Sequence, residues 1–188
     1  MNGDSMFDLF GKYAYWKVIK HFTLNPSTEV YVNELAKIIH LSTGSCSQIL
    51  RDLSSFGILD KKNLGKAHYY SLNNNYLTNE LKRFVGIYRI YENEIVKKIV
   101  SRYSEDISIA LYGSYSKGDF TEKSDIDILV ITQEKPKVDF KDLEEKLEVE
   151  INVEKFTIGQ WLKLKKEKDP FYSMVIKNHI LLHGSELP

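Results

Sequence analysis

The chain has 188 residues, of which 43% are hydrophobic and 28% are charged, and its formal net charge is zero. These proportions exclude an intrinsically disordered chain, and the length allows two small domains. No stretch approaches the roughly 18 consecutive apolar residues of a membrane span, and no basic-then-apolar leader opens the chain, so we expect a cytoplasmic protein. The single cysteine, Cys46, excludes an internal disulfide and a cysteine-based zinc cluster.

The zero net charge conceals an uneven distribution along the chain. Residues 1–75 contain 8 Lys and Arg against 6 Asp and Glu, and residues 76–103 contain 6 against 3. Residues 104–188 contain 12 against 17. A mildly basic first half suits a polyanionic partner, and an acidic last part suits bound cations.

The first part of the chain has the periodicity of three helices followed by a hairpin. Apolar residues recur at helical spacing in residues 6–23, and the run VNELAKIIHL predicts a second, short helix. A third helix is predicted from Ser42, its N-terminal cap, to Phe56, and Gly57 ends it. Two strand-like runs, 58–61 and 67–72, then flank a turn that contains Asn63 and Gly65.

The segments ELAKIIHLSTGSCSQILRDLSSFGILDKK and GKAHYYSL resemble a winged helix-turn-helix domain of the ArsR and MarR kind, over roughly residues 10–74. The resemblance implies that the third helix is a recognition helix for duplex DNA. Its outward side chains would face the major groove: Thr43, Ser45, Ser47, Gln48 and Arg51. The wing would contact phosphates through Lys61, Lys62 and Lys66. Because the helix carries one arginine with Asp52 beside it, a protein-interaction or dimerisation module is the alternative.

Residues 76–103 have the pattern of one long helix. Apolar positions from Leu77 to Ile99 recur at steps of four and three, and most basic residues lie elsewhere on the helical wheel. Such a row of side chains can pack within the chain or against the same helix of a second copy, which would make a homodimer.

The period changes from residue 107 onward. ISIALYG predicts a strand ending in a glycine turn, SDIDILVI a second strand and LEVEINVEKF a third, with a helix in VDFKDLEEKL and two more in TIGQWLKLKKEK and PFYSMVIKNH. This is an α/β unit with a mixed sheet. We therefore predict an α+β winged helix-turn-helix domain over residues 1–75, a connecting helix over 76–103 and an α/β domain over 104–188.

Two acids interrupt the second strand of this unit. Alternation puts Asp125 and Asp127 on one face of the strand, with carboxylates about 6 to 7 Å apart. Because burying such a pair without partners is costly, we expect a positive charge between them.

The sequence contains Gly113 and Ser114, then ten residues, then Asp125-Ile126-Asp127, and an acid on a later strand. This pattern resembles the signature of polymerase-beta-type nucleotidyltransferases over roughly residues 104–188. The short length is similar to that of the minimal nucleotidyltransferases. The resemblance implies that Gly113, Ser114 and Lys117 contact a nucleoside triphosphate such as ATP, and that Asp125 and Asp127 ligate two magnesium ions. A third acid completes the metal site: Glu150 is preferred, with Glu148, Asn152 and Glu154 as alternatives on the same strand face.

The implied reaction is Mg-dependent transfer of a nucleoside monophosphate to a hydroxyl group, with release of pyrophosphate. The acceptor could be a protein side chain, as in antitoxins that modify HEPN partners, a small molecule such as an aminoglycoside, or a nucleic-acid end. The alternative function is a DNA-binding transcription regulator whose nucleotidyltransferase-like domain senses a nucleotide without turnover.

Overall fold

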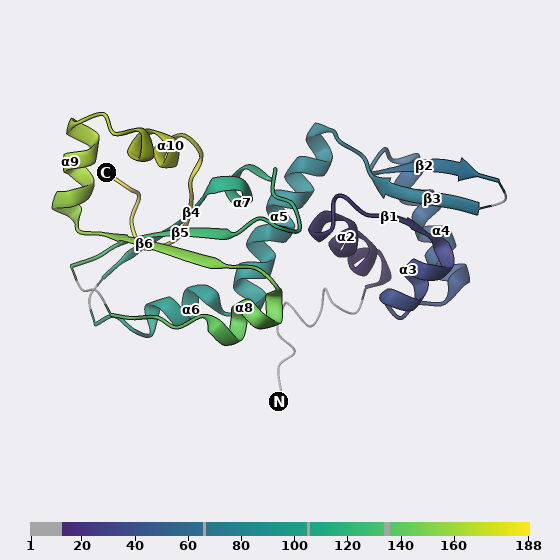
Figure 1. Cartoon of the computed structure of the whole chain (residues 1–188), viewed down its shortest axis with the longest axis horizontal. Helices are drawn as coiled ribbons and strands as arrows, with labels where there is room; N and C mark the ends of the chain where they lie inside the picture. The colour runs from purple at the N-terminus through teal and green to yellow at the C-terminus, as the bar shows by residue number, and fades with distance from the viewer. Residues whose placement is uncertain (1–12, 66, 105, 134–135) are drawn as a thin grey trace. The chain divides into compact units, whose positions relative to one another are not determined.

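The computed structural model describes residues 13–65, 67–104, 106–133 and 136–188. The chain divides into two compact units, Met1–Val85 and Gly86–Pro188, and the boundary falls inside helix α5 (Tyr76–Glu92). Figure 1 labels the helices and strands. No helix among the described residues is long and apolar enough to cross a membrane.

The N-terminal unit contains three helices and a three-stranded sheet. The helices are α2 (Ala14–Leu24), α3 (Val32–Ile38) and α4 (Thr43–Ser55), and the strands are β1 (Glu29–Tyr31), β2 (Leu59–Leu64) and β3 (Ala67–Leu72). The strand order is β1-β3-β2, and both neighbouring pairs are antiparallel. This arrangement of helices followed by a β2–β3 wing confirms the predicted winged helix-turn-helix fold. The first part of the helix predicted over residues 6–23 lies outside the described residues.

Helix α4 forms as its sequence predicts. The Ser42 hydroxyl accepts a hydrogen bond from the Ser45 backbone N–H at 3.1 Å, which caps the first turn. Four side chains at helical spacing are buried in the core of the unit: Cys46, Ile49, Leu50 and Leu53. Phe56, which follows the last residue of the helix, is 73% exposed.

The C-terminal unit is built on a mixed four-stranded sheet. Its strands are β4 (Ser108–Tyr112), β5 (Ile126–Ile131), β6 (Ile151–Phe156) and β7 (Ile180–His183), in the order β6-β5-β4-β7. Strand β4 is antiparallel to β5 and β7, whereas β5 and β6 are parallel. The predicted mixed sheet is therefore confirmed.

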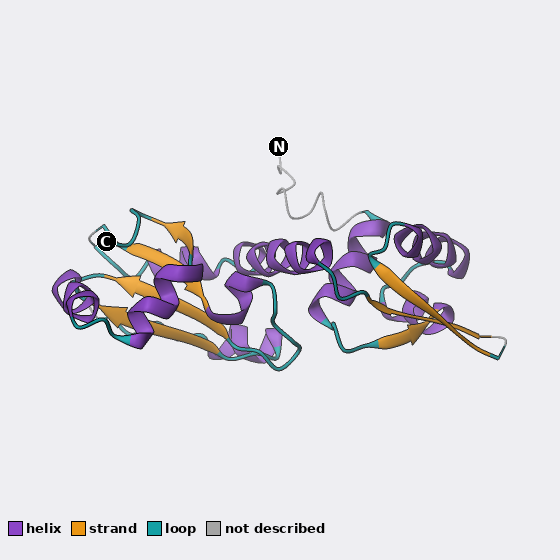
Figure 2. Ribbon diagram, turned by 90° about the horizontal axis from the view of Figure 1, so that it is seen from above, coloured by secondary structure: helices purple, strands orange, loops and turns teal. Residues whose placement is uncertain are grey.

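Helices cover both faces of this sheet (Figures 1 and 2). Helices α9 (Ile158–Lys166) and α10 (Pro170–Asn178) lie on one side, and α6 (Ile95–Val100) and α8 (Lys141–Leu147) lie on the other. Trp161 and Val175 pack in one buried cluster with Ala110, Tyr112 and Leu129 of the sheet. The short helix α7 (Gly113–Lys117) connects β4 to the segment before β5.

The predicted single helix over residues 76–103 is two helices. α5 ends at Glu92, and α6 begins after Glu94, whose φ of 53° lies in the left-handed region. Because a left-handed residue breaks the helical hydrogen-bond ladder, the apolar row cannot continue as one helix face. Within α5, Gly86 lies against the Tyr115–Phe120 stack: an added Cβ would come 3.0 Å from Cδ1 of Tyr115.

Candidate active site and nucleic-acid interface

The candidate active site lies at the end of the sheet where β4 stops and β5 begins. Tyr112, the last residue of β4, is paired with Asp127, the second residue of β5. Gly113 follows with a φ of +72°, a conformation that favours glycine. A Cβ at this position would overlap Oδ2 of Asp127 and lie 3.1 Å from its Cγ. Glycine is therefore needed here for two reasons, the backbone conformation and the close approach of a carboxylate.

Helix α7 places the predicted phosphate-contacting residues beside this turn. Ser114 is half-buried and Lys117 is exposed. The Ser116 hydroxyl donates to the Gly113 carbonyl at 2.9 Å, and Gly118 ends the helix in the left-handed region. The structure thus puts Gly113 against Asp127 and leaves Lys117 on the surface.

The residue that contacts both aspartates is Asn152. Its Nδ2 donates to Oδ2 of Asp125 at 3.3 Å and to Oδ1 of Asp127 at 3.4 Å, both long hydrogen bonds. The parallel register explains this contact, because Asn152 of β6 lies directly opposite Asp127 of β5. The two carboxylates therefore converge on one point in front of the sheet.

The predicted third acid, Glu150, lines an open hollow together with Asp125, but Asn152, not Glu150, lies opposite Asp127. Glu150 is exposed and precedes β6, and its backbone carbonyl accepts a hydrogen bond from the Ile126 N–H at 2.9 Å. Glu148 has a φ of 55° after α8, and Glu154 lies two residues beyond Asn152. Among the described residues, no group of three or more His, Cys, Asp or Glu side chains could hold a metal ion. The structure thus does not bring Asp125, Asp127 and Glu150 together as such a group.

Burial shifts the pKa of two groups at this end of the sheet, Asp127 and Tyr112. Desolvation raises the pKa of Asp127; the hydrogen bond from Asn152 lowers it and the charge of Asp125 raises it. Desolvation also raises the pKa of Tyr112 to about 12, with further contributions from Asp127 and Glu154. The Tyr112 hydroxyl therefore stays protonated near neutral pH.

Arg89 of α5 makes a hydrogen bond to Tyr115 of α7 that the sequence pattern did not indicate. Its guanidinium donates to the Tyr115 hydroxyl at 2.9 Å and to the Leu147 carbonyl at the end of α8. One side chain of α5 thus ties together the helix after Gly113 and the segment that leads into β6. The periodicity of α5 indicates only that Arg89 lies off the main apolar row.

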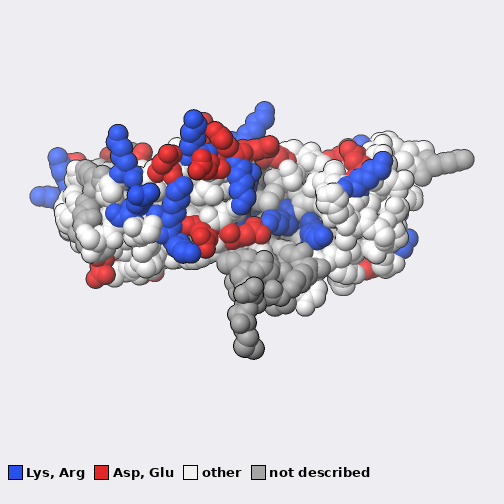
Figure 3. All heavy atoms as spheres, turned by 90° about the horizontal axis from the view of Figure 1, so that it is seen from below, with Lys and Arg blue, Asp and Glu red and all other residues white. Residues whose placement is uncertain are grey.

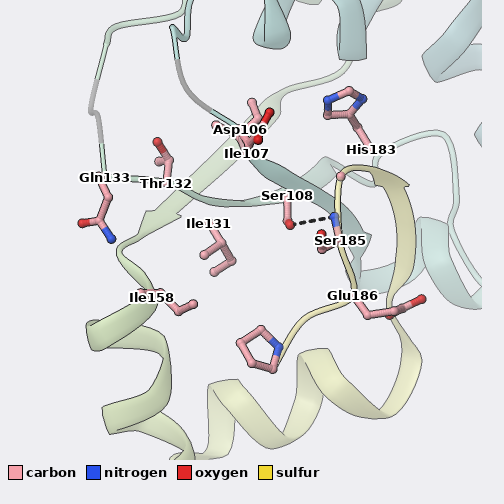
Figure 4. Close-up of a pocket in the computed structure, with 12 residues that line it drawn as sticks. Asp106, Ile107, Ser108, Ile131, Thr132, Gln133, Ile158, His183, Ser185 and Glu186 are labelled. Carbon is pink, nitrogen blue, oxygen red and sulfur yellow. Dashed lines mark hydrogen bonds between the residues drawn. The ribbon is translucent and has the colours of Figure 1, made fainter.

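A hollow of about 560 Å³ lies at the end of the β4–β5 ladder opposite to the aspartates (Figure 4). Ile107, Ile131 and Ile158 contribute apolar lining, and the Ser185 backbone N–H donates to the Ser108 hydroxyl at 3.1 Å. Because Ser108 pairs with Ile131 whereas Tyr112 pairs with Asp127, the full length of the ladder separates this hollow from the aspartates.

Comparisons of the sequence with known proteins concern the C-terminal unit. Residues 93–183 match the family described as a nucleotidyltransferase domain. This segment is a nucleotidyltransferase domain. Two proteins of Methanocaldococcus jannaschii, each named "putative protein adenylyltransferase", are 51% identical over 39 residues and 36% identical over 52 residues. The matches cover 20% and 23% of this chain, and 39% and 52% of those relatives, so each spans less than two thirds of the relative's length.

Solved structures with partial likeness to the chain include two of interest. The adhesin competence repressor of Streptococcus pyogenes is 10% identical, with a TM-score of 0.37 over 49% of this chain and 68% of that one. A structure titled as a toxin-antitoxin with AMP-PNP is 22% identical, with a TM-score of 0.36 over 50% of this chain and 74% of that one.

The predicted DNA-contacting residues of the winged helix lie mostly on the surface. In α4, Thr43, Ser45, Gln48 and Arg51 are exposed, and Ser47 is half-buried. Arg51 donates to Gln48 at 2.8 Å, and Gln48 donates to Asp52 at 2.8 Å, so the helix's one arginine is linked to an acid through Gln48.

The wing lysines differ from one another. Lys61 is exposed on β2, and Lys62 forms a 3.5 Å ion pair with Glu29 of β1. Lys66 lies outside the described residues.

Proposed function

We propose that the nucleotidyltransferase domain transfers a nucleoside monophosphate from a nucleoside triphosphate to a hydroxyl group. The acceptor oxygen forms a bond to the α-phosphorus, the bond from that phosphorus to the bridging oxygen breaks, and pyrophosphate and the hydroxyl proton are released. The observation that supports this proposal is the convergence of Asp125 and Asp127 beside the Gly113–Ser114 turn.

The aspartates fit one divalent cation held jointly with a nucleotide. Mg²⁺ in proteins is commonly bound through one or two carboxylates together with substrate phosphates, and this site offers two carboxylates on one face. When bound, the ion neutralises charge that builds up on the phosphates. Asp125 and Asp127 would hold that ion, and Gly113 would let the backbone approach the triphosphate closely. Among the described residues, no third carboxylate joins Asp125 and Asp127 in a group that could hold a metal ion.

The surroundings of Asp125 favour a neutral or cationic acceptor. Asp125 and Lys123 line an open hollow of about 430 Å³. Four glutamates line the same hollow: Glu144, Glu145, Glu148 and Glu150. Figure 3, which views the C-terminal unit from the side of α6 and α8, shows acidic and basic side chains interleaved on this face. Because clustered carboxylates repel a nucleic-acid backbone, we favour a protein side chain or a small molecule over a nucleic-acid end. A HEPN-type protein is the first protein acceptor to test.

The decisive assay measures label transfer. The protein is incubated with Mg²⁺, a nucleoside triphosphate labelled at the α-phosphate (ATP first, then CTP, GTP and UTP), and candidate acceptors. We expect label on the acceptor and equimolar pyrophosphate from the wild type, and a loss of at least about 100-fold in D125N and D127N. D119N, at an exposed position in the loop before β5, is the matched control and keeps the wild-type rate. Equal rates in wild type and D125N would contradict the proposal.

We further propose that the winged helix binds duplex DNA through α4 and the wing. The exposed polar row of α4 and the exposed Lys61 support this function. In a mobility-shift titration against salt, removing Arg51 or Lys61 should weaken binding and reduce the slope of log K against log salt by about 0.9 for each lost phosphate contact. Lys177 of α10 is exposed and serves as the control. An unchanged slope would support the alternative, a protein-interaction module.

A further inference from the structure

We propose that Asn152 is the positioning residue that sets the metal content of the active site: it holds Asp125 and Asp127 together and leaves them to bind one divalent cation per nucleotide. This inference rests on the proposed nucleotide binding of the same site. It departs from the two-ion site that the Gly-Ser and Asp-x-Asp pattern predicts, because an amide stands where the third carboxylate was expected.

The register of the sheet identifies the position. Strands β5 and β6 are parallel, and Asp127 pairs with Asn152, so both side chains project from the same face. Glu150 lies one pleat before Asn152, outside β6, and Glu154 lies one pleat after it, opposite Leu129. Of the four candidates on this strand face, Asn152 is the one that the structure places within hydrogen-bond distance of both aspartates.

The chemistry of the amide explains the lower metal content. Its NH₂ group donates to one oxygen of each aspartate, and so offsets their mutual repulsion without adding a charge. A carboxylate at this position would instead give three negative charges around one point, which a pair of divalent cations offsets well. Two carboxylates and the nucleotide phosphates supply enough oxygen ligands for one ion, whereas a second ion would meet the amide of Asn152 at the position opposite Asp127 where a carboxylate was expected.

The test counts metal ions directly and needs no turnover. Mn²⁺ binding is measured by electron paramagnetic resonance in the presence of an α,β-methylene nucleoside triphosphate, which cannot be cleaved at the reacting bond. The analogues of ATP, CTP, GTP and UTP are tried, and the one that binds most tightly is used. We expect one Mn²⁺ per chain for the wild type and two for N152D. N178D adds the same charge at an exposed position at the end of α10 and should still bind one.

Thermal unfolding supplies a second measurement. Without divalent ions, N152D should unfold at a lower temperature than the wild type, because the change removes two hydrogen bonds and adds a third negative charge. Saturating Mn²⁺ should remove this difference, and N178D should show no such metal-dependent recovery.

Each outcome decides between the proposals. Two ions bound to the wild type, or one ion bound to N152D, would overturn the role of Asn152 while leaving nucleotide transfer intact. One ion in the wild type and two in N152D, without label transfer to any acceptor, would support this inference and count against the proposed reaction. No binding of any Mn²⁺–analogue complex to the wild type would overturn both.

Discussion

Replacing Gly113 with alanine should lower both the stability of the protein and the activity of the candidate active site, through a backbone effect and a steric effect that can be measured separately. Alanine at a φ of +72° costs about 1 to 2 kcal/mol of stability through the backbone alone. The new Cβ also overlaps Oδ2 of Asp127, and ordinary contacts of a Cβ begin near 3.4 Å. The carboxylate must therefore move by about 1 Å, a displacement that typically lowers catalytic rates about 100-fold.

The two costs separate in a double-mutant cycle. We expect G113A to lower the free energy of unfolding by about 2 to 4 kcal/mol, measured by urea denaturation. In a D127A background the overlap with Oδ2 is gone, so the same change should cost only the backbone part, and the coupling energy should exceed about 1 kcal/mol. Label transfer by G113A, assayed as above, should fall about 100-fold.

Gly159 offers a matched control in the same domain. It lies in α9, and an added Cβ would find its nearest neighbour, the Thr157 hydroxyl oxygen, at 4.0 Å. G159A should therefore be neutral or should stabilise the protein by up to about 1 kcal/mol, because alanine favours the helix. If G113A unfolds within about 0.5 kcal/mol of the wild type and keeps its transfer rate, the close approach of Gly113 to Asp127 does not organise the site.

Two further predictions concern stability. Burial lowers the pKa of His21, and the charge of Glu34 opposes this shift, so the folded state favours the neutral imidazole. The free energy of unfolding should therefore fall as the pH drops below about 6.5. In urea titrations from pH 8 to 5, H21L should show a flatter dependence on pH than the wild type. A wild-type slope that H21L leaves unchanged would refute this assignment. R89M should lower the free energy of unfolding by about 1 to 3 kcal/mol, because it leaves the Tyr115 hydroxyl and the Leu147 carbonyl without their donor. The control R83M, which removes a 3.7 Å surface ion pair with Glu80, should lower it by less than about 1 kcal/mol. Equal losses in the two variants would show that Arg89 does not tether α7 to the end of α8.

Features set by neighbouring residues were predictable from the sequence. The Ser42 cap and the buried face of α4 follow from short-range spacing, and the structure confirms both. The glycine turn follows equally, because the strand-like run ISIALYG ends at Gly113, whereas its pairing with the strand that carries the aspartates is known only from the structure.

Features set by pairing between distant segments were not predictable. Alternation reduces the third metal-site position to four residues on one face of β6 but cannot choose among them, since only the β5–β6 register places Asn152 opposite Asp127. Likewise, helical periodicity continues across Glu94, so it cannot reveal the left-handed residue that separates α5 from α6.

The position of the unit boundary within α5 determines which pieces of this protein can be studied alone. A fragment starting at residue 104 would discard the buried residues Ile90, Ile95 and Ile99 and the Arg89 tether, and would uncover apolar surface of the nucleotidyltransferase domain. We expect such a fragment to aggregate, whereas one starting at Tyr76 keeps the complete helix. We therefore expect that expression of the nucleotidyltransferase domain on its own requires α5, even though the first part of that helix belongs to the N-terminal unit.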